Sequence, residues 1–250
     1  MKIKKILVSQ PEPNNPKYPY YDLAKKYNLK VDFKPFIQIE GVSAKDFRQQ
    51  KINILDHTAV IFTSKTGIDN FFRICGELRI CVPDSMKYFC ITENIAYYLQ
   101  KYIVYRKRKI FYGKSKFQDL IDLIVKHRED NFLIPLPKAH NAEIPDILDK
   151  NKIKYTIGTF YRTISNQFDD AKDFDYDILV FYSPSGIKSL KENFPDFVQG
   201  DIKIAAFGPT TASAVKKEGL RLDIKAPNPK APSMTMALDE YLKEFNKNCK

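Results

Sequence analysis

Short hydrophobic runs, most of them rich in β-branched and aromatic residues, alternate along the chain with segments in which apolar residues recur every three or four positions. The first pattern is typical of buried strands and the second of amphipathic helices. Their alternation predicts α/β layers with parallel strands. The predicted strands are 4–9, 31–36, 58–63, 87–91, 109–112, 131–135, 154–160, 177–182, 202–207 and 222–225. The predicted helices are 20–27, 66–76, 93–102, 116–127, 141–150, 185–193, 209–218 and 233–246.

Two strand-to-helix turns in the second half of the chain carry the clearest chemical signal. The strand ending at Phe207 continues into Gly-Pro-Thr-Thr at 208–211, so that a proline opens the next helix and two threonines are placed to cap it. The strand at 179–182 continues into Ser-Pro-Ser-Gly at 183–186. Free amides at a helix N-terminus bind anions, and open α/β sheets bind ligands at the carboxyl edge of their strands. These turns therefore predict an anion-binding site.

The chain also repeats itself. Phe-Thr-Ser-Lys-Thr-Gly-Ile at 62–68 matches Phe-Tyr-Ser-Pro-Ser-Gly-Ile at 181–187, an offset of 119 residues, and 88–92 matches 204–208 at an offset of 116. The strands at 6–8 and 31–36 resemble those at 132–134 and 155–161. Because the offsets are nearly equal, they indicate a duplication into two similar α/β lobes.

These motifs resemble those of the uroporphyrinogen-III synthase family. The Phe-Tyr-Arg-Thr sequence at 160–163 is similar to a family segment with a hydrophobic residue, a tyrosine, a variable residue and a threonine. The similarity spans essentially the whole chain. The segments that carry it are 62–64, 160–163, 181–186, 207–212, 219–220 and 226–227.

The resemblance implies a fold of two flavodoxin-like α/β lobes that are joined by a two-stranded β-ladder and enclose a cleft. The first lobe would combine residues 1–37 with 165–250, and the second would be 38–164. The ladder strands would lie near 36–40 and 161–165. A connection of two strands with few other contacts predicts large relative motion of the lobes.

The resemblance also implies a reaction. The family cyclises the linear tetrapyrrole hydroxymethylbilane to uroporphyrinogen III, with inversion of the last pyrrole ring and loss of water, as a lyase of tetrapyrrole and haem biosynthesis. No metal or organic cofactor takes part. The family's proposed acid for the departing hydroxyl maps onto Tyr161, and amides, hydroxyls and cations would hold the substrate's carboxylates. The implied substrate-binding residues are Thr63, Ser64, Lys65, Thr92, Arg162, Ser183, Ser185, Gly186, Lys188, Gly208, Thr210 and Thr211.

The sequence departs from the family pattern at two places. Thr92 is followed by Glu93, Asn94 and Ile95, where the family often has a glycine and then a threonine, so this anion-binding turn is expected to be weakened. Gln10 stands where many members carry an arginine, which removes a cation from that turn.

The charge of the chain agrees with a polyanionic partner. The 250 residues are 44% hydrophobic and 28% charged, an ordinary globular composition, with a formal net charge of +11. A polycarboxylate small-molecule substrate satisfies this charge, as nucleic acid or phospholipid would. No apolar run approaches the length of a membrane span or signal peptide, and the cysteines at 75, 81, 90 and 249 form no CxxC pair. We therefore expect reduced thiols, no membrane partner, and a cytoplasmic monomer.

The basic run Arg-Lys-Arg-Lys at 106–109 is the strongest competing signal. With Tyr102, Tyr105, Phe111 and Tyr112 around it, the run could bind nucleic acid by phosphate contacts and base stacking. A solvated turn before the strand at 109–112 explains it more simply, and no nucleic-acid-binding module accompanies it. We expect no nucleic-acid partner.

Plainer interpretations stay open at this stage. Tyr161 could be a packing residue with a hydrated hydroxyl, and 208–211 could be only a well-capped helix start. The chain could also be a two-lobed binding protein that closes on an anionic ligand without chemistry. Metal and nucleotide sites lack support, because His57, His127 and His140 are scattered and the nine glycines form no GxGxxG or P-loop motif.

Overall fold

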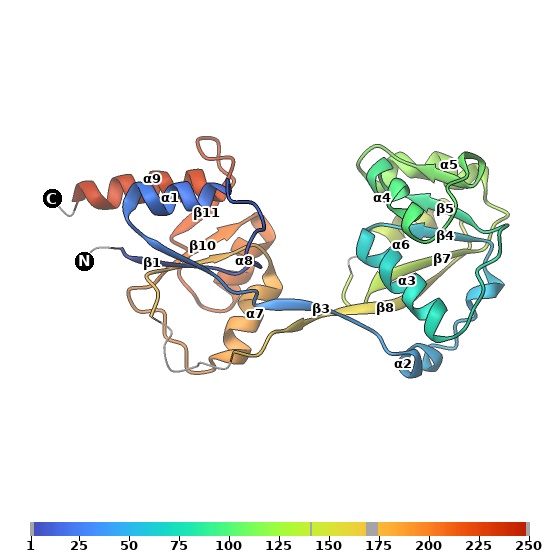
Figure 1. Cartoon of the computed structure of the whole chain (residues 1–250), viewed down its shortest axis with the longest axis horizontal. Helices are drawn as coiled ribbons and strands as arrows, with labels where there is room; N and C mark the ends of the chain where they lie inside the picture. Colours follow the sequence, from blue (N-terminus) through green and yellow to red (C-terminus); the bar gives the residue numbers. More distant parts are fainter. Residues whose placement is uncertain (1–2, 141, 169–174, 249–250) are drawn as a thin grey trace. The chain divides into compact units, whose positions relative to one another are not determined.

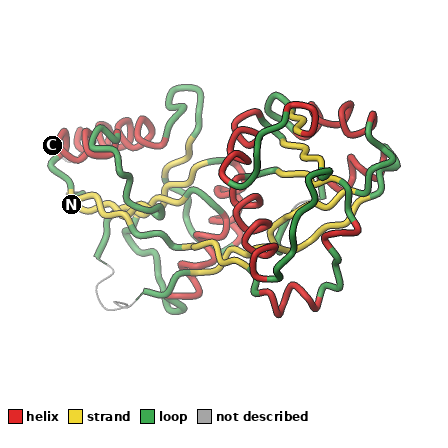
Figure 2. Tube along the Cα trace, turned by 45° about the vertical axis from the view of Figure 1, so that its right-hand side comes forward, coloured by secondary structure: helices red, strands yellow, loops and turns green. Residues whose placement is uncertain are grey.

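The computed structural model describes residues 3–140, 142–168 and 175–248, and the chain packs into two compact units (Figure 1). Unit 1 comprises Met1–Gln38 and Ile164–Lys250, and unit 2 comprises Ile39–Thr163. Each unit is a mainly parallel β-sheet with helices on both faces, and Figure 2 shows strands and helices alternating along the trace.

The sheet of unit 1 has the strand order β11-β10-β9-β1-β2, and its paired strands are parallel. Successive residues of β1 enter different cores, since Ile6 and Val8 pack on one face while Leu7 packs on the other. Helices α1 and α9 cover the first face, and α7 and α8 cover the second. The strands are β1 (Lys5–Val8), β2 (Lys30–Phe33), β9 (Ile178–Phe181), β10 (Lys203–Phe207) and β11 (Ile224–Ala226). The helices are α1 (Pro19–Tyr27), α7 (Pro184–Asn193), α8 (Pro209–Lys217) and α9 (Met234–Asn248).

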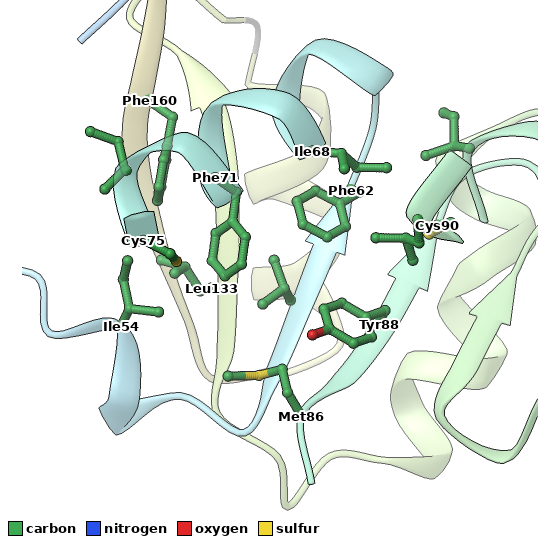
Figure 3. Packing of buried hydrophobic residues seen from close by; sticks show 14 of the residues in the cluster. Ile54, Phe62, Ile68, Phe71, Cys75, Met86, Tyr88, Cys90, Leu133 and Phe160 are labelled. Carbon is green, nitrogen blue, oxygen red and sulfur yellow. The ribbon is translucent and has the colours of Figure 1, made fainter. Parts of the chain in front are cut away.

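The sheet of unit 2 has the strand order β3-β8-β7-β4-β5-β6. One face packs against α2, α3 and α4 through Phe47, Phe71 and Ile95, and Figure 3 shows part of this cluster. The other face packs against α5 and α6 through Ile124 and Leu148. The strands are β3 (Ile37–Gly41), β4 (Ala59–Phe62), β5 (Lys87–Cys90), β6 (Ile110–Tyr112), β7 (Phe132–Pro137) and β8 (Tyr155–Ser165). The helices are α2 (Ala44–Gln49), α3 (Lys65–Glu77), α4 (Glu93–Tyr98), α5 (Ile121–Lys126) and α6 (Glu143–Lys150).

The two sheets share one topology with different starting points in the chain. Counted along the chain, the strands of unit 1 lie in the order 2-1-3-4-5, which is the flavodoxin-like order. The parallel strands of unit 2 lie in the order β8-β7-β4-β5-β6. If β7 and β8 are counted first and β4, β5 and β6 after them, this order is also 2-1-3-4-5. Unit 2 is therefore related to unit 1 by a circular permutation. This is the structural form of the repeat seen in the sequence, and it confirms the predicted fold class of two similar parallel α/β lobes.

Strands β3 and β8 are neighbours in the sheet, and each crosses the boundary between the units. Asn166 N donates to Phe36 O at 2.9 Å, and Val42 N donates to Phe160 O at 2.9 Å. Phe36 is thus bonded to the later residue, Asn166, and Val42 to the earlier one, Phe160. The two strands therefore run antiparallel.

Each predicted strand and helix has a counterpart in the structure, with shifted ends. The predicted helix 93–102 is α4 followed by a 3₁₀ turn at Leu99–Lys101, and 116–127 opens as a 3₁₀ turn at Phe117–Leu120 before α5. The pattern missed α2, which is too short to show a helical period. Residue 141, where another predicted helix begins, lies outside the described residues, as does Cys249, while Cys75, Cys81 and Cys90 are free thiols. Within the described residues, no helix has both the length and the apolar character needed to cross a bilayer.

Candidate functional site

Ser64 and Ser183 occupy equivalent positions in the two units, and each caps the helix that follows its strand. Ser64 Oγ accepts a hydrogen bond from Gly67 N at 3.0 Å at the start of α3. Ser183 Oγ accepts one from Gly186 N at 3.2 Å at the start of α7. Both glycines are buried close to their serine, because a Cβ on either would lie 3.5–3.6 Å from the serine oxygen. The repeat therefore places the same hydroxyl and amide arrangement at the carboxyl edge of both sheets.

The next strand in each sheet also ends in a helix N-terminus, but these two ends differ. Thr92 caps α4 through a 3.4 Å hydrogen bond from Ile95 N, and α4 opens with Glu93, whose carboxylate accepts from Tyr112 Oη at 2.9 Å. A carboxylate in the first turn already occupies the positive end of the helix dipole. This junction is therefore the poorest anion-binding site of those predicted.

Helix α8 begins without a side-chain cap. Its N-cap is Gly208, at φ 87° and ψ 154°, so the prediction that Thr210 and Thr211 cap the helix is wrong. Both threonines lie inside the first turn, Thr210 exposed and Thr211 buried at 1% exposure. Among the described residues, the backbone amides of Thr210 and Thr211 have no hydrogen-bond acceptor in the protein. Because no side chain competes for them, these amides are open to an external anion.

Tyr161 on β8 is brought to Ser64 of the first junction. The two hydroxyl oxygens are 3.2 Å apart, and Tyr161 is 7% exposed. The register between β7 and β8 shifts at Leu136 and Pro137, so that Phe160 and Tyr161, although consecutive, pack in the same cluster. Burial raises the pKa of Tyr161, and the hydrogen bond with Ser64 opposes this rise only in part. The phenol therefore keeps its proton at neutral pH.

The predicted cations are placed differently from one another. Arg162 lies opposite Glu40 across the β3–β8 pair and forms an ion pair with it, 2.5 Å from Nε to Oε2. Lys188 pairs with Glu192 at 3.3 Å one turn along α7. Lys65 is exposed with its Nζ 5.1 Å from the centre of the Tyr98 ring, and no ion pair involves it among the described residues. Of the three, Lys65 alone is available to a substrate carboxylate without breaking an existing pair.

A family model described as uroporphyrinogen-III synthase HemD matches residues 20–236 of this sequence. The match includes both serine caps, the Gly208 junction and Tyr161. The chain belongs to the uroporphyrinogen-III synthase family. The family assignment made from the sequence is thereby confirmed.

Solved structures of this family share the fold. The uroporphyrinogen-III synthetase from Helicobacter pylori is similar over 97% of this chain and 100% of its own, with 17% identity and a TM-score of 0.59. A mutant uroporphyrinogen III synthase from Thermus thermophilus is similar over 98% of this chain and 99% of its own, with 14% identity and a TM-score of 0.53. Among curated proteins, a search gave no match.

The structure adds a pair of tyrosines to the residues that the sequence singled out. Tyr182, directly before Ser183, lies with its hydroxyl oxygen 2.8 Å from that of Tyr20 on α1. Both tyrosines line a cavity of about 260 Å³, together with Phe207 and the start of α9. Burial raises the pKa of Tyr182 to about 12. The repeat contained a signal for Tyr182, which is equivalent to Thr63, but nothing in the sequence pointed to Tyr20.

The remaining predicted residues lie at the same junctions. Thr63 directly precedes Ser64 and is half-buried, Ser185 is exposed in the first turn of α7, and Gly186 is buried beneath it. Gly186 has a packing reason to be glycine, because a Cβ there would lie 3.2 Å from the Phe181 ring. The structure thus gathers the predicted residues of each unit at the carboxyl edge of its sheet. Their contacts with substrate stay predictions.

Proposed function

We propose that this chain converts hydroxymethylbilane to uroporphyrinogen III, with Tyr161 assisting departure of the terminal hydroxyl and helix N-termini holding the carboxylates. The observation that carries the reaction is the family match over residues 20–236. The assignment of Tyr161 is supported by its hydrogen bond with Ser64 at the start of α3. From the same family membership we infer a cytoplasmic location and a small-molecule partner.

The main task of the protein in this reaction is to determine which position of the last pyrrole ring reacts. Loss of the terminal hydroxyl leaves an azafulvene cation that is already reactive, and it closes without inversion when left alone. Inversion requires that its electrophilic carbon meet the already substituted position of the last ring. Holding the chain in that geometry removes the entropy cost of finding it, which is worth several kcal/mol in well-oriented reactions, up to about 7–11 kcal/mol.

Tyr161 is suited to act as a weak acid. Its raised pKa keeps the phenol protonated, so a proton is available to the leaving hydroxyl. Gly67 N already donates to Ser64 Oγ, and the Ser64 hydroxyl proton can then point to the Tyr161 oxygen. In that arrangement the Tyr161 proton is left to point outward to the substrate. Ser64 therefore orients the proton that Tyr161 donates.

Helix N-termini supply the binding groups for the substrate's acetates and propionates. Helices α3, α7 and α8 run 13, 10 and 9 residues, and none has an acidic residue in its first turn. Their dipoles therefore favour bound carboxylates. The uncapped start of α8 offers the amides of Thr210 and Thr211, and Lys65 adds a charged partner at α3. The net charge of +11 raises the local concentration of a polyanion.

The product-isomer assay tests the proposed function. Purified protein is supplied with hydroxymethylbilane, and the ratio of type III to type I product is measured after oxidation. We expect type III to dominate with the protein and type I without it. A ratio equal to that of the protein-free sample contradicts the enzymatic function and favours a binding protein without chemistry.

A further inference from the structure

A cavity of about 460 Å³ lies in unit 2 at the edge of the sheet away from the serine caps. Its walls come from the loops that precede β5 and β6 and from the second half of α3. These loops meet the amino ends of the strands, whereas Ser64 and Thr92 follow the carboxyl ends. Four-residue strands separate the two edges by about 13 Å. The cavity is therefore distinct from the candidate active site.

Most of the side chains that line this cavity are apolar, and Tyr88 adds a hydroxyl group. Phe72, Met86 and Ile110 line it, and Figure 3 shows Met86 and Tyr88 at this end of the buried cluster. Tyr88 also lines the cavity at 4% exposure, with its ring stacked on Phe62. In the described part of the chain, no group forms a hydrogen bond with the Tyr88 hydroxyl. A hydroxyl that lines a cavity and has no protein partner is suited to hydrogen bonding with a ligand.

The charged residues that line the cavity leave one positive charge uncompensated. Arg106 forms an ion pair with Asp84 at 3.2 Å. Lys109 also lines the cavity, and within the described residues it has no ion-pair partner. Tyr88 on β5 is paired in register with Ile110 on β6, and Lys109 is the last residue of the 3₁₀ turn that precedes β6. A ligand with a single negative charge would neutralise the unpaired charge of Lys109.

This arrangement also accounts for the basic run at 106–109. Two of the aromatic residues around the run stack within the protein: Tyr102 on Phe72 at 4.5 Å and Tyr105 on Tyr97 at 5.6 Å between ring centroids. Stacking within the protein leaves these two rings less available for bases, on which single-strand binding relies. Two of the four basic residues of the run line the cavity instead.

We propose that this cavity binds a small aromatic monocarboxylate, with its ring against Phe72, Met86 and Ile110, its carboxylate at Lys109 and a hydrogen-bonding substituent at Tyr88. The volume lies within the range of small-molecule sites, about 300–1,000 Å³, and such sites combine apolar walls with a few polar groups as this one does. The ligand is a single acid, unlike the polycarboxylate at the opposite edge.

The test uses the full chain and 3-(4-hydroxyphenyl)propionate as probe, with amide shifts measured by NMR. We expect the largest shifts at 80–88 and 103–110. Two analogues dissect the contacts: the propionamide lacks the charge, and 3-phenylpropionate lacks the hydroxyl. Each should bind roughly tenfold more weakly, the usual effect of losing a charged or buried hydrogen bond. The proposal is overturned by shifts that appear instead at 64–67, or by equal binding of acid and amide.

Variants locate the site independently. Lys109→Gln should weaken the acid roughly tenfold and leave the amide unchanged. Lys107→Gln is its matched control, since Lys107 belongs to the same run and does not line the cavity. If both variants weaken binding of the acid equally, the effect comes from the overall positive charge of the run, and the assignment of the carboxylate to Lys109 is wrong. Tyr88→Phe should weaken the hydroxylated probe and spare 3-phenylpropionate.

Gly76 allows the cavity to be filled without disturbing the fold. It lines the cavity, and a Cβ there meets nothing within 4 Å. A side chain at this position of α3 also favours the helix over glycine. Gly76→Leu should therefore abolish probe binding while the melting temperature is kept or raised, and Gly76→Ala should reduce binding less. Full binding by Gly76→Leu would contradict the proposed site.

Discussion

The hydroxyl of Tyr161 lies 3.2 Å from Oγ of Ser64, although the two residues are 97 positions apart. The serine is fixed by the α3 amide that it caps, and the tyrosine by a register shift in β8. The pair joins a helix cap to the tyrosine for which we propose a role as an acid.

Tyr161→Phe should lower kcat for type III formation by roughly 10–100-fold, at or below the lower end of the range for a general acid, because a reactive leaving group needs limited help. Phenylalanine preserves the buried ring, so the fold should persist. Stopped assays of both isomers measure the effect. The same change at Tyr98, whose hydroxyl contacts Asp69, is the control and should leave kcat unaltered. Unchanged kinetics in Tyr161→Phe would remove its assigned role.

Ser64→Ala should lower both stability and kcat. Loss of the N-cap costs about 1 kcal/mol of unfolding free energy, and loss of the partner of Tyr161 misorients its proton. Ser43→Ala is a matched control, since Ser43 Oγ caps α2 by accepting from Asp46 N at 3.1 Å. Urea denaturation should give similar losses for both variants, whereas kcat should fall only for Ser64→Ala. A fall in kcat for both would attribute the effect to stability alone.

Gly208→Ala should destabilise the protein and raise KM. The backbone at φ 87° and ψ 154° is nearly restricted to glycine, and forcing a side chain there costs about 1–3 kcal/mol. Relief of that strain would move the first-turn amides of α8. Gly200→Ala is the control, at φ 48° and likewise with nothing within 4 Å of a Cβ. It should lose about 1 kcal/mol with KM unchanged. An unaltered KM in Gly208→Ala would speak against α8 as a binding site.

The pair formed by Glu40 and Arg162 can be used to ask whether Arg162 binds substrate. Arg162→Gln should raise KM, and Glu40→Gln should lower it, because removing the carboxylate frees the guanidinium. Both should change stability by less than about 1 kcal/mol, as is usual for exposed pairs. If neither variant alters KM, Arg162 serves only to hold β3 and β8 together.

Alkaline pH should weaken the fold through Tyr182. In the unfolded chain a tyrosine has a pKa of about 10, whereas burial raises the pKa of Tyr182 to about 12 in the folded chain. Its contribution is therefore complete below pH 10 and is lost as pH rises to 12, since the unfolded state releases its proton first. Urea denaturation as a function of pH should show a shallower decline for Tyr182→Phe than for the parent. A decline of equal slope would contradict this, and Tyr97→Phe, at an exposed position, is the control.

Local patterns in the sequence predicted the parallel strands and the strand-to-helix turns at 62–68 and 181–187, because short apolar runs and small-residue turns are local features. That Ser64 and Ser183 cap the helices after these turns was not predicted. The capping by Thr210 and Thr211 was wrongly predicted, since Gly208 takes the N-cap position through a backbone conformation that the sequence does not display. Strand β3 was expected only from the family resemblance, as Ile-Gln-Ile-Glu-Gly resembles any partly exposed segment. The Tyr161–Ser64 contact depends on a register shift, which no periodicity shows.

The antiparallel pairing of β3 with β8 has a consequence for how the chain folds. Strand β1 must find β9, which lies beyond the whole of unit 2. Once unit 2 has folded and the hydrogen bond from Asn166 N to Phe36 O has formed, residues 37–165 are ordered and no longer add to the flexible chain between β1 and β9. The loop left to close shrinks to the segments 9–36 and 166–177, and its entropic penalty shrinks with it. Folding of unit 2 thus brings the two segments of unit 1 close together, and we expect the sheet of unit 1 to form after unit 2.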